Sequence, residues 1–207
     1  IPLLYVLTVT TTNEKDETLI HGLYIGGSRE LFQMSVVRSQ QKNMTKLSKP
    51  DKKAVVFLDP REFRSTWLVN KAVYRTRMAM AEGGELIVLA PNVKKFGEDD
   101  ENDRLIRKYG YVGRKKVLEL VKNEEELKNN LSVAAHLIHG SSDGKFKVTY
   151  CTKHLTKEEV EGVGFEFMPY DEAVKKYNPQ ILKDGYNTVG GEEIYYISNP
   201  ALGLWTI

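Results

Sequence analysis

LDPREFRSTWLVNKAVYRTRMAMAEGGELIVLAPNVKKFGEDDENDRLIRKYG, residues 58–110, is the stretch that decides the fold. It reads as a strand end, an amphipathic helix over residues 66–82, a Gly-Gly break, a continuous apolar strand and a polar loop leading into another helix. Gly83 and Gly84 are expected to end the first helix, because glycine suits the left-handed residue after a last turn. Two strands joined by a helix predict a parallel pair, whose carboxyl ends form the edge where an α/β sheet usually binds its ligand.

The same alternation of strand and helix continues through most of the chain. Further strands are expected at 54–60, 85–91, 145–152, 164–167 and 190–198, and further helices at 28–40, 103–110, 123–139, 157–162 and 171–177. Thr156 and Glu159 form a capping box ahead of one of these helices. The pattern predicts a three-layer α/β domain with a mainly parallel sheet.

The two ends of the chain lie outside this alternation. Two β-rich segments, 3–9 and 18–25, predict a hairpin, and the last residues, YYISNPALGLWTI, are apolar and aromatic. Because the termini of a complete domain are usually polar, we expect a fragment in which residues 1–27 and 186–207 complete a missing neighbouring domain, around an α/β domain at 28–185. The alternative is a processed chain whose terminal strands pair with each other.

Composition indicates a globular protein with a core of its own. The 207 residues are 41% hydrophobic and 28% charged, with a net charge of +2 from interspersed charges, so we expect neither a nucleic acid nor a membrane as partner. No apolar run approaches the roughly 20 residues that span a bilayer. Cys151 is the only cysteine, which excludes an intrachain disulfide and favours the reducing cytoplasm.

A cationic pair marks the predicted helix after the first buried strand. Lys71 and Arg75 are one turn apart, and a bound carboxylate would offset the repulsion between like charges at this spacing. An ordinary solvated helix face has the same pattern. Trp67, one turn before Lys71, is compatible with a pocket wall or with the core.

Polar side chains also follow the ends of two buried strands. Asp59 follows the first strand, and Asn92, Lys94 and Lys95 follow the second. Because the carboxyl ends of parallel strands share one edge, we predict that these four residues line a substrate site with Lys71 and Trp67. Turn formation by Asp59 and solvation of the lysines are the alternatives.

No motif assigns catalysis to this chain. The phosphate-binding loop, the dinucleotide fingerprint and the nucleophile elbow are absent from the sequence. His136, His139, Cys151 and His154 are potential zinc ligands, but their spacing is not that of a standard zinc site. We therefore predict no metal site and no catalytic residue within these residues.

Three segments together carry a resemblance to a known family: NKAVYRTRMAMAEGGELIVLAP, FGEDDENDRLIRKYGY and YYISNPALGLW. The chain resembles the carboxyl-terminal region of the lactate racemase family, in particular its branch of racemase-like 2-epimerases. The resemblance implies two α/β domains with the active site between them. It also implies a nickel pincer nucleotide, held by the missing amino-terminal domain, that accepts and returns the C2 hydrogen of the substrate as hydride.

The resemblance assigns this chain a narrower part in the reaction. Lys71 matches a lysine that holds the substrate's oxygens, while Trp67 and Leu68 replace the tyrosine and glutamine of lactate racemases. We therefore expect a fragment of a racemase or 2-epimerase, inactive alone, whose substrate is a hydroxy acid or sugar acid other than lactate. The alternative is a non-catalytic α/β module that binds a small anion or a partner protein.

Overall fold

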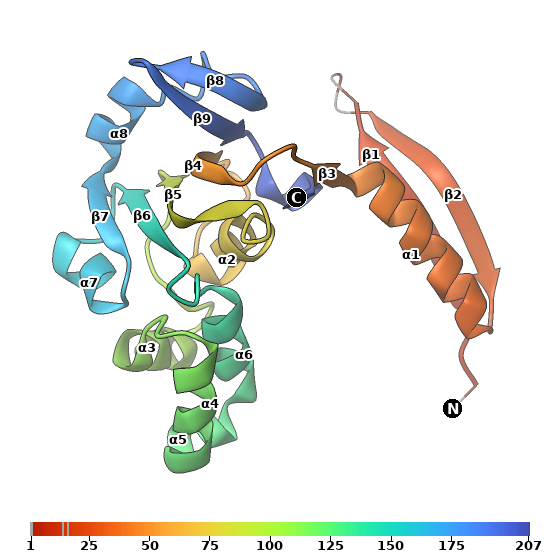
Figure 1. Cartoon of the computed structure of the whole chain (residues 1–207). Helices are drawn as coiled ribbons and strands as arrows, with labels where there is room; N and C mark the ends of the chain where they lie inside the picture. Colours follow the sequence, from red (N-terminus) through yellow and green to blue (C-terminus); the bar gives the residue numbers. More distant parts are fainter. Residues whose placement is uncertain (1, 14, 16) are drawn as a thin grey trace.

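The apolar runs of the sequence form the centre of a six-stranded sheet. A computed structural model describes residues 2–13, 15 and 17–207. Ile1, the start of the predicted terminal segment 1–27, and Glu14 and Asp16, in the predicted turn, lie outside the described residues. The strand order is β7-β6-β5-β4-β9-β8, and every neighbouring pair is parallel except β8 and β9 (Figure 1). The mainly parallel sheet that the sequence predicts is confirmed.

The elements of this domain alternate as follows: β3 (Met44–Lys46), β4 (Asp51–Phe57), α2 (Thr66–Tyr74), β5 (Met80–Ala90), α3 (Asp100–Tyr109), α4 (Arg114–Asn123), α5 (Glu125–Asn129), α6 (Leu131–His139), β6 (Phe146–Thr152), α7 (Lys157–Gly162), β7 (Glu166–Pro169), α8 (Tyr170–Lys176), β8 (Gly185–Val189), β9 (Glu192–Ile197), η1 (Pro200–Leu202) and β10 (Leu204–Thr206).

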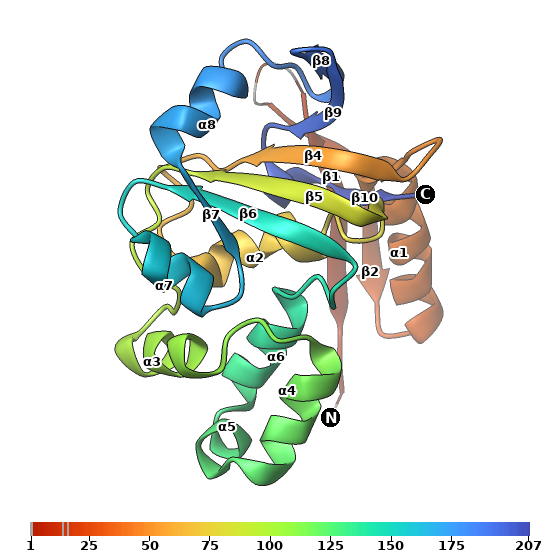
Figure 2. The ribbon, with the colours of Figure 1, turned by 60° about the vertical axis from the view of Figure 1, so that its left-hand side comes forward.

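Helices cover both faces of the sheet, which makes the domain three-layered (Figure 2). Val56 and Val88 point to the face covered by α2, α3, α6 and α7, and belong to the larger core cluster. Val55 and Ile87 point to the opposite face and pack with Ala173 of α8. Because alternate residues of a strand face opposite sides, both sets must be apolar, which explains the continuous apolar runs.

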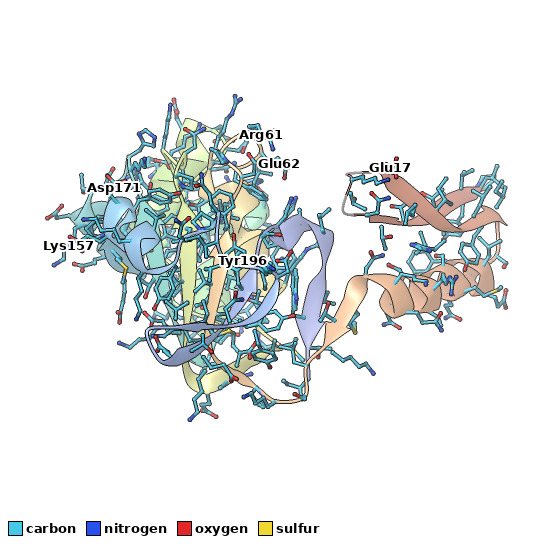
Figure 3. The ribbon with its side chains drawn as sticks, turned by 90° about the horizontal axis from the view of Figure 1, so that it is seen from above. Glu17, Arg61, Glu62, Lys157, Asp171 and Tyr196 are labelled. Atoms are coloured by element: carbon cyan, nitrogen blue, oxygen red, sulfur yellow. The ribbon has the colours of Figure 1, made fainter. Side chains whose placement is uncertain are left out.

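A hairpin and a helix stand apart from this domain (Figures 1 and 3). Strands β1 (Tyr5–Thr12) and β2 (Thr18–Gly26) pair in antiparallel fashion, and α1 (Arg29–Asn43) packs on one face of the hairpin. We call these three elements the hairpin–helix unit. The predicted hairpin is confirmed, and Ser28 caps α1 by accepting a hydrogen bond from the backbone N–H of Leu31.

The predicted helix over residues 66–82 is wrong in its second half. α2 ends at Tyr74, where the hydroxyl of Thr76 donates to the carbonyl of Ala72 at 2.6 Å, and β5 already begins at Met80. Gly83 and Gly84 lie inside β5, near a register shift against β4, and not at a helix end. Met80 pairs with Asp51 of β4, and this long-range pairing extends the strand.

The predicted division at residues 28–185 also needs correction. β9 pairs with the central strand β4, so residues 192–197 belong to the main sheet instead of returning to a neighbouring domain. At the other boundary, α1 packs on β1 and β2, so the hairpin–helix unit extends to Asn43. The last strand, β10, pairs with β3 in a separate parallel pair and not with the first strand of the chain.

The predicted helix over residues 123–139 is broken into two. α5 and α6 meet at Asn130, whose side chain accepts a hydrogen bond from the N–H of Val133 and caps α6. The sequence pattern did not predict α4, which precedes them. Among the described residues, no helix has both the length and the apolar character that a membrane crossing requires.

Candidate functional site

The carboxyl ends of β4 and β9 meet where the strand order turns back. The chain adds β5, β6 and β7 on one side of β4 and then places β9 on the other side. Asn199, just after β9, donates from Nδ2 to Oε2 of Glu62, in the loop after β4, at 3.4 Å. Figure 3 labels Arg61 and Glu62 at this edge. An α/β sheet commonly binds its ligand at such a point.

Asp59 shapes the turn that follows β4. Its carboxylate accepts hydrogen bonds from the backbone N–H of Arg61 at 2.8 Å and from the guanidinium Nη2 of Arg61 at 2.6 Å. These bonds lower the pKa of the Asp59 carboxyl. Asn92, from the loop after β5, donates to the carbonyl of Pro60 at 2.8 Å. The structure thus brings Asp59 and Asn92 to the same turn, as the sequence predicts.

Lys94 and Lys95 lie beside the first residues of α2. The carbonyl of Lys95 accepts from the N–H of Thr66 at 3.0 Å, and the ammonium of Lys95 donates to the carbonyl of Glu98 at 2.5 Å. The Glu98 carboxylate in turn accepts from the hydroxyl of Ser65 at 3.0 Å. Lys95 therefore holds its own loop against the helix, while the side chain of Lys94 is exposed.

Lys71 lies on the second turn of α2 and is half-buried. No hydrogen bond or ion pair joins it to any other residue in the part of the chain that the structure describes. Its neighbour one turn earlier on the same face, Leu68, is 37% exposed. A carboxylate can replace the hydration that partial burial removes from an ammonium group.

Arg75, one turn after Lys71, has a structural role. Its Nη1 donates to the carbonyls of Ala201 at 3.2 Å and Gly203 at 3.0 Å, and its own carbonyl accepts from the N–H of Trp205 at 3.0 Å. Arg75 thereby fastens the end of the chain to α2. Arg75 therefore binds the end of the chain, whereas Lys71 has no partner among the described residues.

Trp67 stacks on a buried histidine of the neighbouring helix. The ring centroids of Trp67 and His136 are 4.4 Å apart, with an angle of 8° between the planes. Nδ2 of Asn70 lies 2.9 Å from Nδ1 of His136, and the hydroxyl of Tyr111 lies 2.9 Å from Nε2. We call Trp67, Asn70, Tyr111 and His136 the aromatic–amide cluster. It fixes α2 against α6, directly beside Lys71.

His136 is neutral within this cluster. Burial, followed by the nearby His139, lowers the pKa of His136 from 6.5 to about 3. An Nδ1 that accepts from Asn70 and an Nε2–H that donates to Tyr111 satisfy both neighbours, whereas a proton on Nδ1 would face the Asn70 amide donors. The sequence contains a signal for the burial of His136, because this histidine shares a helix with the apolar residues Val133 and Leu137.

The predicted site residues therefore fall into two groups. Asp59, Asn92 and Lys95 are joined by hydrogen bonds to the loops at the carboxyl edge, and Lys94 lies exposed beside them. Lys71 and Trp67 lie on α2. No hydrogen bond or ion pair joins the side chain of Lys71 to the loops at the carboxyl edge in the described part of the chain.

The potential metal ligands are not brought together. Cys151 is buried with Val55 and Ile87 on the far face of the sheet, and burial raises the pKa of its thiol to about 12. His136 lies on the opposite face, within the aromatic–amide cluster. Across the described residues, no group of three or more His, Cys, Asp or Glu side chains has the arrangement to hold a metal ion.

Comparison with known proteins identifies a shared fold. The sequence matches no protein-family model and no curated protein. The structure is similar to the crystal structure of a Thermotoga maritima protein, with a TM-score of 0.71 and 23% identity over 98% of this chain and 48% of that chain. It is also similar to the lactate racemase apoprotein of Thermoanaerobacterium thermosaccharolyticum, with a TM-score of 0.63 and 13% identity over 96% of this chain and 45% of that chain. The chain spans about half the length of these proteins and has the fold of the corresponding half of lactate racemase.

Proposed function

We propose that this chain is the substrate-closing part of a longer racemase or 2-epimerase that acts on a 2-hydroxy acid or sugar acid. The observation that carries the proposal is the half-buried, unpartnered ammonium of Lys71 in a chain with the fold of half a lactate racemase. The carboxylate that all substrates of this class share is a suitable partner for that ammonium. In this chain, Lys71 binds and orients the substrate.

The role of Lys71 is electrostatic in this proposal. A fixed ammonium in a partly desolvated position stabilises negative charge on the substrate's oxygens more strongly than water does. The aromatic–amide cluster keeps α2 in place, so Lys71 needs no large rearrangement to meet the substrate. Leu68, exposed beside it, offers an apolar contact for the carbon chain of the substrate.

The family resemblance implies a nickel pincer nucleotide, but the residues of this chain do not fit it. The described residues contain no set of three or more His, Cys, Asp or Glu side chains that would hold a metal ion. We propose that an accompanying domain holds the cofactor.

The exposed apolar face of the hairpin supports such an accompanying domain. Val6, Ile20, Leu23 and Ile25 are 63%, 69%, 59% and 58% exposed, on the face of the hairpin away from α1. Soluble proteins rarely leave a contiguous apolar patch of this kind uncovered. Because the structural neighbours are about twice as long as this chain, we propose that a further α/β domain of a longer polypeptide covers this face.

Substitution of Lys71 in the longer protein tests the catalytic proposal. Lys71→Ala is expected to lower kcat/KM for racemisation by about a hundredfold or more, because it removes a charge that contacts the substrate. Its urea unfolding should change little, since Lys71 has no partner to lose in the described part of the chain. Lys122→Ala, an exposed helix lysine, is the matched control. Chiral chromatography of hydroxy acids and aldonates gives the rates, with the protein produced alongside cofactor-synthesis enzymes.

Two outcomes count against the proposal in different ways. Wild-type kcat/KM in Lys71→Ala would remove Lys71 from the reaction while leaving the enzyme class standing. No racemisation of any acid by the longer protein, together with thermal stabilisation of this chain by lactate or gluconate, would favour the alternative of a non-catalytic anion-binding module.

Substitution of the hairpin face tests the domain proposal. We expect the exposed apolar face to cause self-association of the isolated chain. Val6→Thr with Ile25→Thr should reduce that self-association in sedimentation velocity, and should destabilise the longer protein by about 1–3 kcal/mol. Leu118→Thr, at a residue of α4 that is 49% exposed, should do neither. Equal stability of the longer protein with and without the hairpin substitutions would contradict the proposal that a further domain covers this face.

A further inference from the structure

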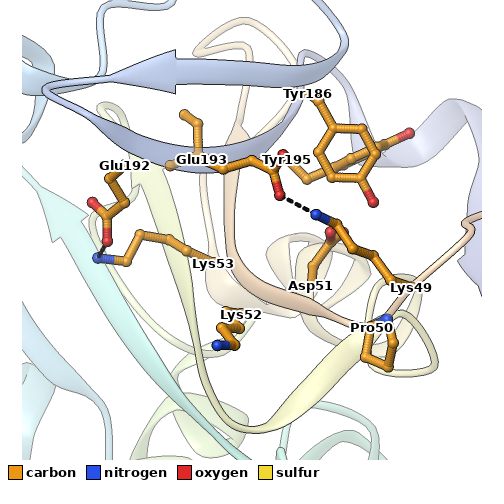
Figure 4. A pocket seen from close by; sticks show the side chains of 10 residues that line it. Lys49, Pro50, Asp51, Lys52, Lys53, Tyr186, Glu192, Glu193 and Tyr195 are labelled. Carbon is orange, nitrogen blue, oxygen red and sulfur yellow. Dashed lines mark hydrogen bonds and ion pairs between the residues drawn. The ribbon is translucent and has the colours of Figure 1, made fainter.

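A hollow lies at the amino-terminal edge of the sheet, opposite the edge discussed above (Figure 4). It has a volume of about 350 Å³ and lies between the start of β4 and the strands β8 and β9. The side chains that matter for its chemistry are those of Lys49, Asp51, Tyr186, Glu193 and Tyr195. Nothing in the proposed racemase function uses them.

Asp51 is a buried carboxylate in the wall of this hollow. It is 5% exposed and forms a side-chain hydrogen bond with Tyr186. Within the described residues, no ion pair of 4.0 Å or less joins it to a cation. Burial, with a smaller contribution from Glu193, raises the pKa of Asp51 to about 6, while Tyr186 and Lys49 act in the opposite direction. At neutral pH the hollow therefore holds a buried negative charge without a direct counter-ion.

An ammonium group of the chain itself already lies at the mouth of the hollow. The Nζ of Lys49 is 5.4 Å from the ring centroid of Tyr186 and forms an ion pair with Glu193, as the dashed line in Figure 4 marks. Tyr186 is braced by an edge-on contact with Tyr195, with ring centroids 5.0 Å apart. An aromatic face beside carboxylates is the usual environment for recognition of an organic cation.

The side chain of Lys49 is free to leave this position. It is 55% exposed, and its direct partners among the described residues are Glu193 and the Tyr186 ring. Lys53, by contrast, is held by Glu85 at 3.2 Å and Glu192 at 2.6 Å, so its charge is already neutralised. Departure of Lys49 would leave Asp51, Glu193 and the Tyr186 ring facing an open hollow.

We propose that this hollow is a binding site for a small organic ammonium ion, which takes the position of the Lys49 ammonium against Tyr186, Glu193 and Asp51. The ligand supplies the positive charge near Asp51 that Lys49 supplies when the ligand is absent. Lys49 acts as an internal competitor, and it closes the hollow when the ligand is absent. The site is independent of Lys71 and of the racemase proposal, because it lies at the other edge of the sheet.

Titration of the full chain with choline, followed by two-dimensional amide NMR, tests this proposal. Choline should shift the amides of Asp51, Tyr186 and Glu193, and the neutral isostere of choline, with carbon in place of the quaternary nitrogen, should bind at least about tenfold more weakly. Lys49→Met should tighten choline binding about fivefold by removing the competitor. Lys122→Met, which removes an exposed charge on α4 away from the hollow, should change the affinity less than about twofold.

Two variants and a change of pH complete the test. Tyr186→Leu and Asp51→Asn should each weaken choline binding about tenfold. Binding should also weaken as the pH falls through about 6, because Asp51 becomes protonated and loses its negative charge. The titratable groups around Asp51 are Tyr186 of β8, Glu193 and Tyr195 of β9, and Lys49. Equal binding of choline and its neutral isostere, or an unchanged affinity in Lys49→Met, would overturn the proposal. Absence of any choline-dependent shift at these residues would do so as well.

Discussion

At the scale of single residues, His136 best illustrates how burial sets chemistry. Its imidazole is stacked on Trp67 and hydrogen-bonded by Asn70 and Tyr111, and the Oδ1 of Asn70 is buried without a partner. A proton added to the imidazole would place a charge in this apolar surrounding. The cluster therefore stabilises only the neutral form of His136, and this has a consequence for stability at low pH.

We predict that the free energy of unfolding depends on pH through His136. The unfolded chain protonates this histidine near pH 6.5, but the folded chain does so only near 3, so the unfolded state binds more protons between these values. The stabilisation is fully present above pH 6.5 and is lost as the pH falls towards 3. His136→Gln should remove about 2–3 kcal/mol of the loss between pH 6.5 and 4 in urea denaturation.

An NMR titration provides the direct check on His136. Its ring resonances should not move on acidification to about pH 5. An ordinary midpoint near 6.5 would show that the imidazole is accessible to protons, and the aromatic–amide cluster would then not hold it neutral.

Residue patterns identified the candidate site only in part. Asp59 and Asn92 meet at one turn because the carboxyl ends of parallel strands must share an edge, and this followed from strand order alone. The different roles of Lys71 and Arg75 could not be predicted from strand order. The role of Arg75 requires the fold of the whole chain. It depends on carbonyls of Ala201 and Gly203, more than a hundred residues further along the chain.

At the scale of elements, the largest difference between the predicted and the observed structure is the boundary between α2 and β5. AVYRTRMAMAE has helical periodicity, yet the chain leaves the helix at Arg75. Arg77 donates to the carbonyls of Ile138 and Ser141 at the end of α6, and Met80 enters the sheet beside Asp51. Both contacts are distant in sequence, and such tertiary contacts commonly override local propensity.

We predict opposite effects for two helix-terminal glycines. At Gly140, after α6, an added Cβ would lie 2.4 Å from Oδ1 of Asn70 and 2.5 Å from Cε1 of Tyr111. Gly140→Ala should therefore destabilise the protein by about 2–3 kcal/mol through overpacking of the aromatic–amide cluster. At Gly162, the last residue of α7, an added Cβ would meet nothing within 4 Å, and Gly162→Ala should stabilise by up to about 0.5 kcal/mol.

Chemical denaturation of both glycine variants measures the difference. Equal stability of Gly140→Ala and Gly162→Ala would mean that the cluster is loosely packed. α2 would then not be fixed against α6 in the way that the contacts of Trp67 and Asn70 indicate.

At the scale of the whole molecule, the hairpin–helix unit and the sheet domain differ in their means of stabilisation. The sheet domain buries strands on both faces, whereas the unit has two strands and one helix with few buried residues, Val9 and Ser35 among them. A two-stranded sheet is marginally stable by itself. The unit is joined to the domain through β3, which pairs with β10.

We predict that the hairpin–helix unit opens independently of the sheet domain. In native-state hydrogen exchange, amides of β1 and β2 should exchange with a free energy of opening at least about 3 kcal/mol below that of β5. The reason is the exposed apolar face of the hairpin, which contributes no burial in this chain. The longer protein should protect the same amides, and equal protection in β1 and β5 of the isolated chain would contradict independent opening.

The sequence by itself determined the α/β class, the parallel central strands, the hairpin and the capping box at Thr156. These features depend on periodicity and on residues within one turn, which a single sequence records directly. Only the tertiary structure decided the strand order, the end of α2, the use of Arg75 on the tail and the hollow around Asp51. Each of those joins residues distant along the chain, and the free energy that selects among such contacts comes from burial and packing instead of local propensity.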